Sequence, residues 1–170
     1  QVAGTDISAG LAMLEVRQES GHLIDLQIVA FPQEGIESFA NGRALMSEAV
    51  ALGADVVGGI PHFENTREQG VSSVHFLMDL AERHNRLVDV HCDETDDPLS
   101  RHIETLAFHT QRLGLQGRVT GSHLTSMHSM DNYYVSKLMG LMVEAQVHVA
   151  SNPNVNITLQ GRHDTYPKRR

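Results

Sequence analysis

The sequence has no tryptophan, a single cysteine (Cys92), and fewer basic than acidic residues, 13 against 21. One cysteine cannot form an internal disulfide, so a reducing compartment is indicated and the cytoplasm is the expected location. The formal charge of −8 repels phosphate backbones, and we expect no nucleic-acid partner. The one basic run, Lys168-Arg169-Arg170, is short and terminal and is interpreted as a solvated tail.

Long apolar runs are also missing. No stretch approaches the ~18 consecutive apolar residues of a transmembrane helix, and the N-terminus lacks the pattern of a signal peptide. We therefore expect no membrane association. Apolar residues nevertheless make up 41% of the 170 residues, which suits one folded domain over residues 1–170.

Short aliphatic and β-branched runs alternate with segments of helical spacing. The predicted strands are residues 23–31, 55–58, 87–91, 118–123 and 146–151. The predicted helices are residues 7–19, 43–52, 71–84, 99–113 and 129–145. The last strand residues lie 27, 33, 32 and 28 positions apart, a regularity that indicates an α/β fold with parallel strands and covering helices.

Two α/β architectures fit this pattern. The length favours a doubly wound five-strand domain, because a (β/α)₈ barrel usually needs about 250 residues. The regular repeat fits both architectures, because one barrel unit takes ~31 residues. No Gly-rich phosphate loop or dinucleotide fingerprint follows any predicted strand, so the usual sign of a nucleotide-binding domain is absent.

Histidine is the abundant reactive residue, with eleven copies. His91 and His123 end neighbouring predicted strands, and the carboxyl ends of parallel strands are where α/β folds bind ligands. Two imidazoles about one strand spacing (~5 Å) apart could share a metal ion. Glu94, three positions after His91, is placed to carry protons between a metal-activated water and a leaving nitrogen. A buried structural histidine is the alternative for either His91 or His123 taken alone.

Other polar residues follow the strands. Gln33, directly after the predicted strand that ends at Phe31, offers an amide that matches the edge of an amide-like heterocycle, and a plain turn residue is the alternative. His62 and Glu64 follow the second strand and are interpreted as surface-loop residues, with a place at the same opening as the alternative. Cys92 is interpreted as a small buried residue.

Several linked motifs resemble the cytosine deaminases of the metal-dependent amidohydrolase superfamily. The similarity runs in order from about Leu11 to Arg170. It rests on Leu26-Gln27-Ile28-Val29-Ala30-Phe31-Pro32-Gln33-Glu34-Gly35, Gly53-Ala54-Asp55-Val56-Val57-Gly58, Ile60-Pro61-His62-Phe63-Glu64, Val90-His91-Cys92-Asp93-Glu94, Ser122-His123 and Leu159-Gln160-Gly161-Arg162.

The resemblance implies a (β/α)₈ TIM-type barrel and a site for a divalent metal ion, iron or zinc. His91 would bind the metal, His123 would bind it or contact the water it activates, and Glu94 would shuttle protons. Gln33 and Phe31 would bind the substrate. The implied reaction is hydrolytic deamination of cytosine to uracil and ammonia by a homo-oligomeric complete protein, with another amino-heterocycle, such as a triazine or purine, as the alternative substrate.

The same resemblance implies that the chain is partial. The family's metal site also uses a His-x-His pair on strand one and an aspartate on strand eight, and the sequence contains neither element. We therefore expect an incomplete barrel with about five strands, corresponding to strands three to seven, that is nearly inactive alone. A complete, non-enzymatic doubly wound binding domain is the competing interpretation.

Overall fold

The computed structural model describes residues 7–162, which form helices and parallel strands in alternation. The elements in chain order are α1 (Ser8–Ser20), β1 (Val29–Ala30), α2 (Gly42–Ala51), β2 (Val56–Gly59), η1 (Pro61–Phe63), α3 (Arg67–His84), β3 (Leu87–Cys92), α4 (His102–Arg112), β4 (Val119–His123), η2 (Thr125–Ser129), α5 (Asn132–Glu144), β5 (His148–Ala150) and α6 (Pro153–Leu159). The prefix η marks short 3₁₀ helices. The α/β class expected from the sequence is confirmed.

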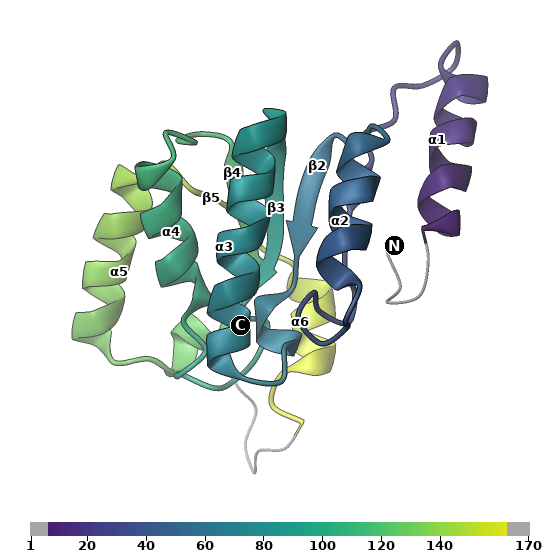
Figure 1. The fold of residues 1–170 in the computed structure, drawn as a ribbon. Coiled ribbons are helices and arrows are strands. Elements are labelled where there is room, and N and C mark those ends of the chain that lie inside the picture. Colours follow the sequence, from purple (N-terminus) through teal and green to yellow (C-terminus); the bar gives the residue numbers. More distant parts are fainter. Residues whose placement is uncertain (1–6, 163–170) are drawn as a thin grey trace.

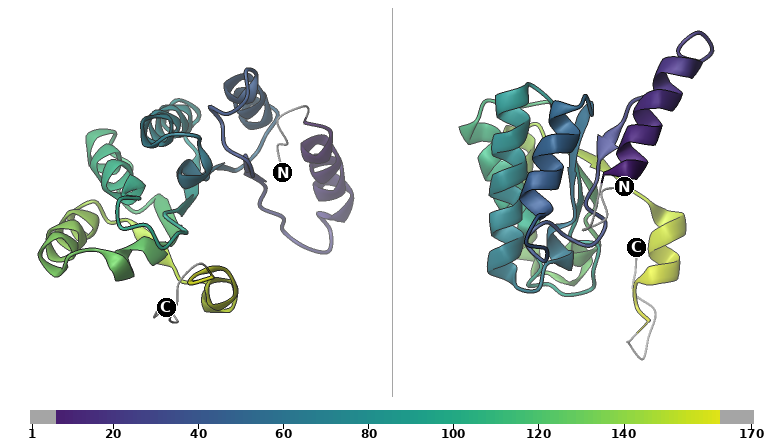
Figure 2. Two further views of the ribbon diagram at one scale, coloured as in Figure 1. Left: turned by 90° about the horizontal axis from the view of Figure 1, so that it is seen from below. Right: turned by 45° about the vertical axis from the view of Figure 1, so that its right-hand side comes forward.

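The five strands form one parallel sheet in the order β1-β2-β3-β4-β5. Helices α2 to α5 lie side by side along one face of this sheet, as Figure 1 shows. Seen from one end, they follow an arc around the curved sheet, while α6 lies on the other side (Figure 2). This arrangement is part of a (β/α)₈ barrel. The doubly wound alternative is wrong, because that fold reverses its strand order at a switch point and has helices on both faces.

The hydrophobic core lies between the sheet and these helices. On β3, Val88, Val90 and Cys92 are fully buried towards the helices, whereas Asp89 and His91 alternate with them and are only half-buried. The helix side of this core includes Leu77, Met78, Leu80, Ile103 and Leu106, each fully buried. Because side chains alternate along a strand, this packing directs Asp89 and His91 to the opposite, concave face of the sheet.

The first strand is much shorter than predicted. Residues 23–27 lie outside the sheet, and Leu23 and Ile24 are 73% and 52% exposed. Pairing starts at Ile28, whose carbonyl accepts from Asp55 N and Val56 N, and whose own N–H donates to Asp55 Oδ2. β2 begins at Val56, the register partner of Val29, so the β-rich residues before Ile28 have no strand beside them among the described residues.

Helix boundaries differ from the prediction where local capping decides them. α3 begins four residues earlier than expected because Thr66 Oγ1 accepts from Gln69 N and caps it. α5 begins later, at Asn132, because Asp131 accepts from Tyr133 N and Tyr134 N. The sequence analysis missed η1, η2 and α6. α6 starts with Pro153 at its first turn, a position that proline favours.

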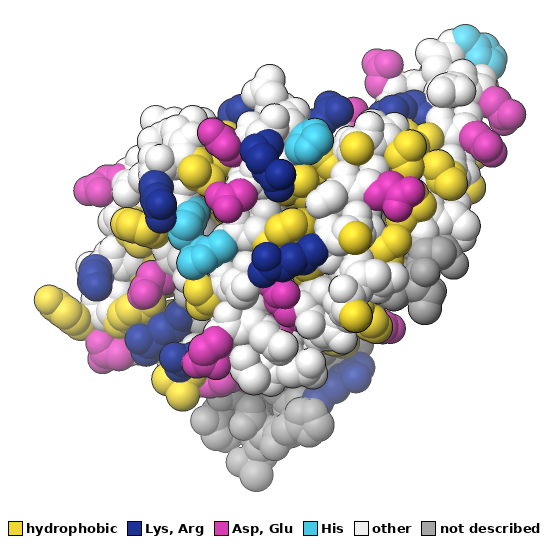
Figure 3. All heavy atoms as spheres, in the orientation of Figure 1, with side chains coloured by type: hydrophobic (Ala, Val, Ile, Leu, Met, Phe, Trp, Pro, Cys, Tyr) yellow, Lys and Arg dark blue, Asp and Glu magenta, His cyan; other side chains and the backbone are white. Residues whose placement is uncertain are grey.

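The outer surface of the helices that cover the sheet carries basic and acidic side chains side by side, with histidines among them, as the space-filling view shows (Figure 3). No helix within residues 7–162 is long and apolar enough to cross a bilayer. The tail Lys168-Arg169-Arg170 lies outside the described residues.

Candidate metal centre

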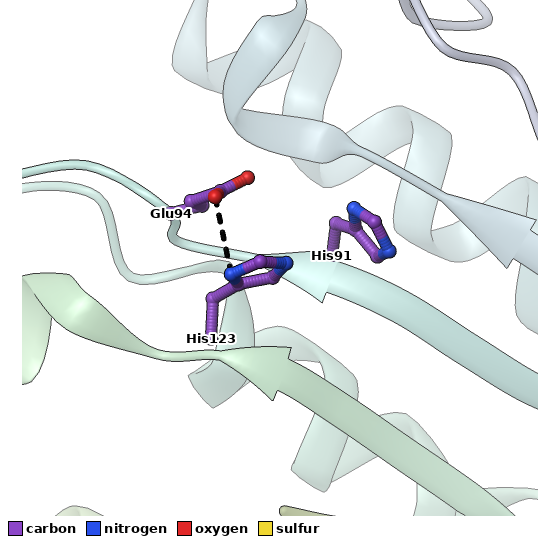
Figure 4. Close-up of side chains that lie close together, drawn as sticks. All are labelled: His91, Glu94 and His123. Carbon is purple, nitrogen blue, oxygen red and sulfur yellow. Dashed lines mark ion pairs between the residues drawn. The ribbon is translucent and has the colours of Figure 1, made fainter. Parts of the chain in front are cut away.

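Three side chains meet at the carboxyl ends of β3 and β4. His91 lies near the end of β3, Glu94 follows that strand, and His123 ends β4 (Figure 4). One ligand atom from each residue lies within 4.8 Å of those of the other two, and among the described residues this is the one His/Cys/Asp/Glu group with such spacing. The imidazole centroids of His91 and His123 are 4.7 Å apart, and His123 Nδ1 lies 3.1 Å from Glu94 Oε1.

The electrostatics of this group favour metal binding. Burial, and secondarily the neighbouring His123, lower the pKa of His91, so its ring is neutral at pH 7 as a metal ligand must be. Burial raises the pKa of Glu94, although His123 opposes this shift. A carboxyl group whose pKa is raised in this way can release and recover a proton nearer neutral pH than an exposed glutamate can.

The donor set fits a divalent transition metal. Two donors that each lie ~2.1 Å from one ion can be at most ~4.2 Å apart, close to the spacing seen here. Imidazole nitrogens are ligands that zinc and ferrous iron accept, and the carboxylate of Glu94 beside them can exchange protons with a water on such an ion. Only small side-chain shifts would therefore bring the two imidazoles around one ion.

Helix α6 covers the group from the concave side of the sheet. Asn156 Nδ2 lies 3.0 Å from His123 Nδ1 and donates to Glu94 Oε1 at 3.4 Å. Gln160 Nε2 donates to the carbonyl of Glu94. The sequence analysis assigned no site role to either residue, although the spacing of four between Asn156 and Gln160 places both on one helix face.

The loop after β1 also reaches the site. The ring of Phe31 lies 4.5 Å from that of His91, centroid to centroid. Gln33, two residues further on, is exposed at the turn that Gly35 N closes by donating to Pro32 O. The structure thus brings Phe31 into contact with His91, while Gln33 lies in the adjoining turn.

Two buried carboxylates hold the loops around the site. Asp93 is fully buried and accepts from Ser100 Oγ, His102 N, His102 Nδ1 and Ile103 N at 2.6–3.0 Å. Burial alone would raise the pKa of Asp93, but the hydrogen bonds from His102 and Ser100 lower it. It caps α4, whose residue before the helix, Arg101, provides no side-chain cap.

Glu64 is the second buried carboxylate, with 8% of its surface exposed. Its interpretation as a surface-loop residue is wrong, because it accepts hydrogen bonds from the backbone of residues 36–38. Cys92, in contrast, is fully buried as expected, and burial followed by the nearby Asp93 raises the pKa of its thiol.

Comparisons with known proteins agree with this geometry. The model of the Amidohydrolase family matches residues 5–170. The 5-methylcytosine deaminase from Klebsiella pneumoniae, solved with phosphonocytosine and with 5-fluorocytosine, is 59% identical over 96% of this chain, with a TM-score of 0.92. N-isopropylammelide isopropylaminohydrolase from Burkholderia multivorans is 31% identical over 85% of the chain, with a TM-score of 0.72.

A curated relative, the N-isopropylammelide isopropyl amidohydrolase of Pseudomonas sp. (strain ADP), is 34% identical over 113 residues, or 66% of this chain. This chain spans 28% of that relative, 40% of the Klebsiella enzyme and 38% of the Burkholderia enzyme. The family match covers nearly all of the sequence and agrees with the strand order. The chain belongs to the amidohydrolase family of metal-dependent hydrolases.

Proposed function

We propose that this chain is the central part of a barrel enzyme that hydrolytically deaminates cytosine or 5-methylcytosine. The observation that carries the proposal is the cluster of His91, Glu94 and His123 at the strand ends. The 59% identity to a 5-methylcytosine deaminase supports the pyrimidine as substrate. Further strands of a longer polypeptide would complete the barrel, because the relatives are more than twice as long as this chain.

In the proposed reaction, water adds to the ring carbon that carries the amino group, and ammonia leaves. His91 and His123 would hold a divalent ion, iron or zinc, which acidifies the attacking water. Glu94 would accept a proton from that water and then deliver it to the departing nitrogen. Asn156, in contact with both His123 and Glu94, would keep those side chains in place.

The substrate would lie beside the histidine pair. The ring of Phe31, which lies beside His91, would contact the pyrimidine ring, and the amide of Gln33 would bind the polar edge of the pyrimidine. An amide can donate to a ring carbonyl and accept from a ring N–H at once. This pairing favours a heterocycle with an amide-like edge over an aliphatic substrate.

Turnover of cytosine and 5-methylcytosine by the complete barrel protein tests this function, with ammonia release as the measurement. We expect both compounds to be deaminated, and expect Glu94→Gln to lower kcat by at least about 100-fold, the scale of general acid–base catalysis. Glu82→Gln, at an exposed position on α3, is the matched control and should leave kcat unchanged. Turnover of N-isopropylammelide without turnover of either pyrimidine would overturn the proposed substrate.

The 170 residues alone should be nearly inactive, because two histidines are fewer than the three protein ligands that catalytic zinc sites commonly use. Fast deamination by this chain with added metal would contradict that expectation. The homo-oligomeric state of the complete protein, its cytoplasmic location and the absence of nucleic-acid and membrane partners stay predictions.

A further inference from the structure

We propose that Glu64 is a positioning residue that sets the substrate-recognition loop, defined as residues 31–38, and thereby places Gln33 against the substrate. The inference deepens the proposed deaminase function and rests on it. Glu64 follows β2 and η1, so it reaches the loop after β1 from the neighbouring unit of the barrel. It does not itself touch His91, Glu94 or His123 through any hydrogen bond that the structure shows.

The carboxylate of Glu64 accepts hydrogen bonds from three consecutive residues of that loop. Oε1 accepts from Ile36 N at 2.6 Å and from Glu37 N at 3.1 Å. Oε2 accepts from Glu37 N, Ser38 N and Ser38 Oγ, each at 3.1 Å. A buried carboxylate is costly unless charge-assisted hydrogen bonds offset the cost, so this set of donors explains why a glutamate can be buried here.

The backbone of the loop is shaped to receive the carboxylate. Gly35 has a φ of +93°, and a Cβ at this position would lie 2.6 Å from Glu64 Oε2. A side chain at Gly35 would therefore meet both backbone strain and a steric clash. The close approach of Glu64 requires glycine at this position.

The loop is thus fixed on both sides of Gln33. On one side, Phe31 packs against His91, and on the other, residues 36–38 bind Glu64. Between these points, the turn from Pro32 to Gly35 carries the exposed Gln33. Because an exposed side chain has few contacts of its own, its position depends on the backbone, and Glu64 determines where that backbone lies.

Glu64→Gln in the complete protein tests the inference. The amide NH₂ of glutamine would face N–H donors, so the loop should loosen and KM for cytosine should rise about tenfold, with kcat changed less than about threefold. Ser38→Ala removes one donor only and should raise KM by less. Glu68→Gln, an exposed residue in the first turn of α3, is the control that should change neither constant.

The decisive comparison combines Glu64→Gln with Gln33→Ala. If Glu64 acts through Gln33, adding Glu64→Gln to Gln33→Ala should raise KM no further. A general structural role predicts the opposite result: a fall in kcat per protein with unchanged KM, and independent effects of the two substitutions. Either of those outcomes would overturn the inference.

Amide hydrogen exchange separates this inference from the proposed function. In Glu64→Gln, the amides of Ile36, Glu37 and Ser38 should exchange at least about tenfold faster, since an NH₂ donor replaces one acceptor oxygen and the negative charge that strengthened these hydrogen bonds is lost. If the complete protein deaminates neither pyrimidine, the proposed function fails, whereas accelerated exchange still supports the hold of Glu64 on the loop. Unchanged exchange at these amides would overturn the inference whatever the activity.

Discussion

His91 and His123 face each other with ring centroids 4.7 Å apart although they are not register partners. The ladder pairs His91 with Ser122 and Cys92 with His123. Strict alternation would turn His123 towards the helices, as it does Cys92. His123 instead has a φ of 76° and Leu124 one of 52°, and this turn brings the imidazole to the concave face and buries Leu124 in the core.

Because of that turn, substitutions of His123 should affect folding stability and metal affinity in different ways. A non-glycine residue in the left-handed region costs about 1–2 kcal/mol, so we expect His123→Gly to unfold at the same or a higher urea concentration. His123→Val, whose side chain is β-branched, should unfold at a lower one. Both variants should lose metal affinity. Equal urea midpoints for the glycine and valine variants would show that the backbone at His123 is not strained.

Asp93 should be the most stability-critical carboxylate near the site. Asp93→Asn replaces one acceptor oxygen with a donor and removes the charge that faces His102, which should lower the free energy of unfolding by about 3 kcal/mol. Urea denaturation measures this loss. Asp97→Asn, an exposed residue of the same loop, should cost less than about 1 kcal/mol. Similar losses for both variants would argue against the capping role of Asp93.

His109 should make the fold sensitive to mild acid. Burial, and then the adjacent His75, lower the pKa of His109 below its usual value, with the ring centroids 4.2 Å apart. The unfolded chain therefore takes up the proton first, and stability should fall as pH drops below ~6.5 towards the folded-state pKa. His109→Leu should flatten this decline between pH 7 and 5 in urea titrations. The exposed control His22→Leu should leave the decline of stability with falling pH unchanged. A decline as steep in the His109 variant as in the wild type would refute the assignment of this pH dependence to His109.

Gly58 should tolerate no side chain. A Cβ there would lie 2.7 Å from the ring of Phe31 and 2.9 Å from the carbonyl of Ala30, so Gly58→Ala should cost about 1–3 kcal/mol and displace Phe31 from His91. Gly140→Ala is the matched comparison, because nothing lies within 4 Å of its Cβ and it stands inside α5. That substitution should raise stability by about 0.5–1 kcal/mol. Thermal melts of the two variants should move in opposite directions.

The sequence was most informative where periodicity was strong. The runs around Val88 to His91 and Val119 to His123 are buried strands, and their spacing placed the two histidines at one edge of the sheet. The expected side-by-side placement is confirmed, but the assumed equivalence of their positions is not, because they differ by one residue in register. Backbone turns with positive φ at a histidine carry no clear sequence signal.

Contacts between residues far apart in the chain could not be predicted from the sequence pattern. Glu64 lies in a loop, and its neighbours in the sequence, Phe63 and Asn65, are both exposed. Only the fold brings residues 36–38 to it. Similarly, α6 is short and begins at Pro153, soon after the predicted strand of residues 146–151, so its approach to Glu94 could not be inferred from local spacing.

Zinc titration of the complete protein by calorimetry tests the central claim most directly. The wild type should bind one ion per chain, while His91→Ala and His123→Ala should each weaken binding by at least about 100-fold. His22→Ala, at an exposed position, should bind as the wild type does. Zinc affinity that is the same in the His91 and His123 variants as in the wild type would contradict the account.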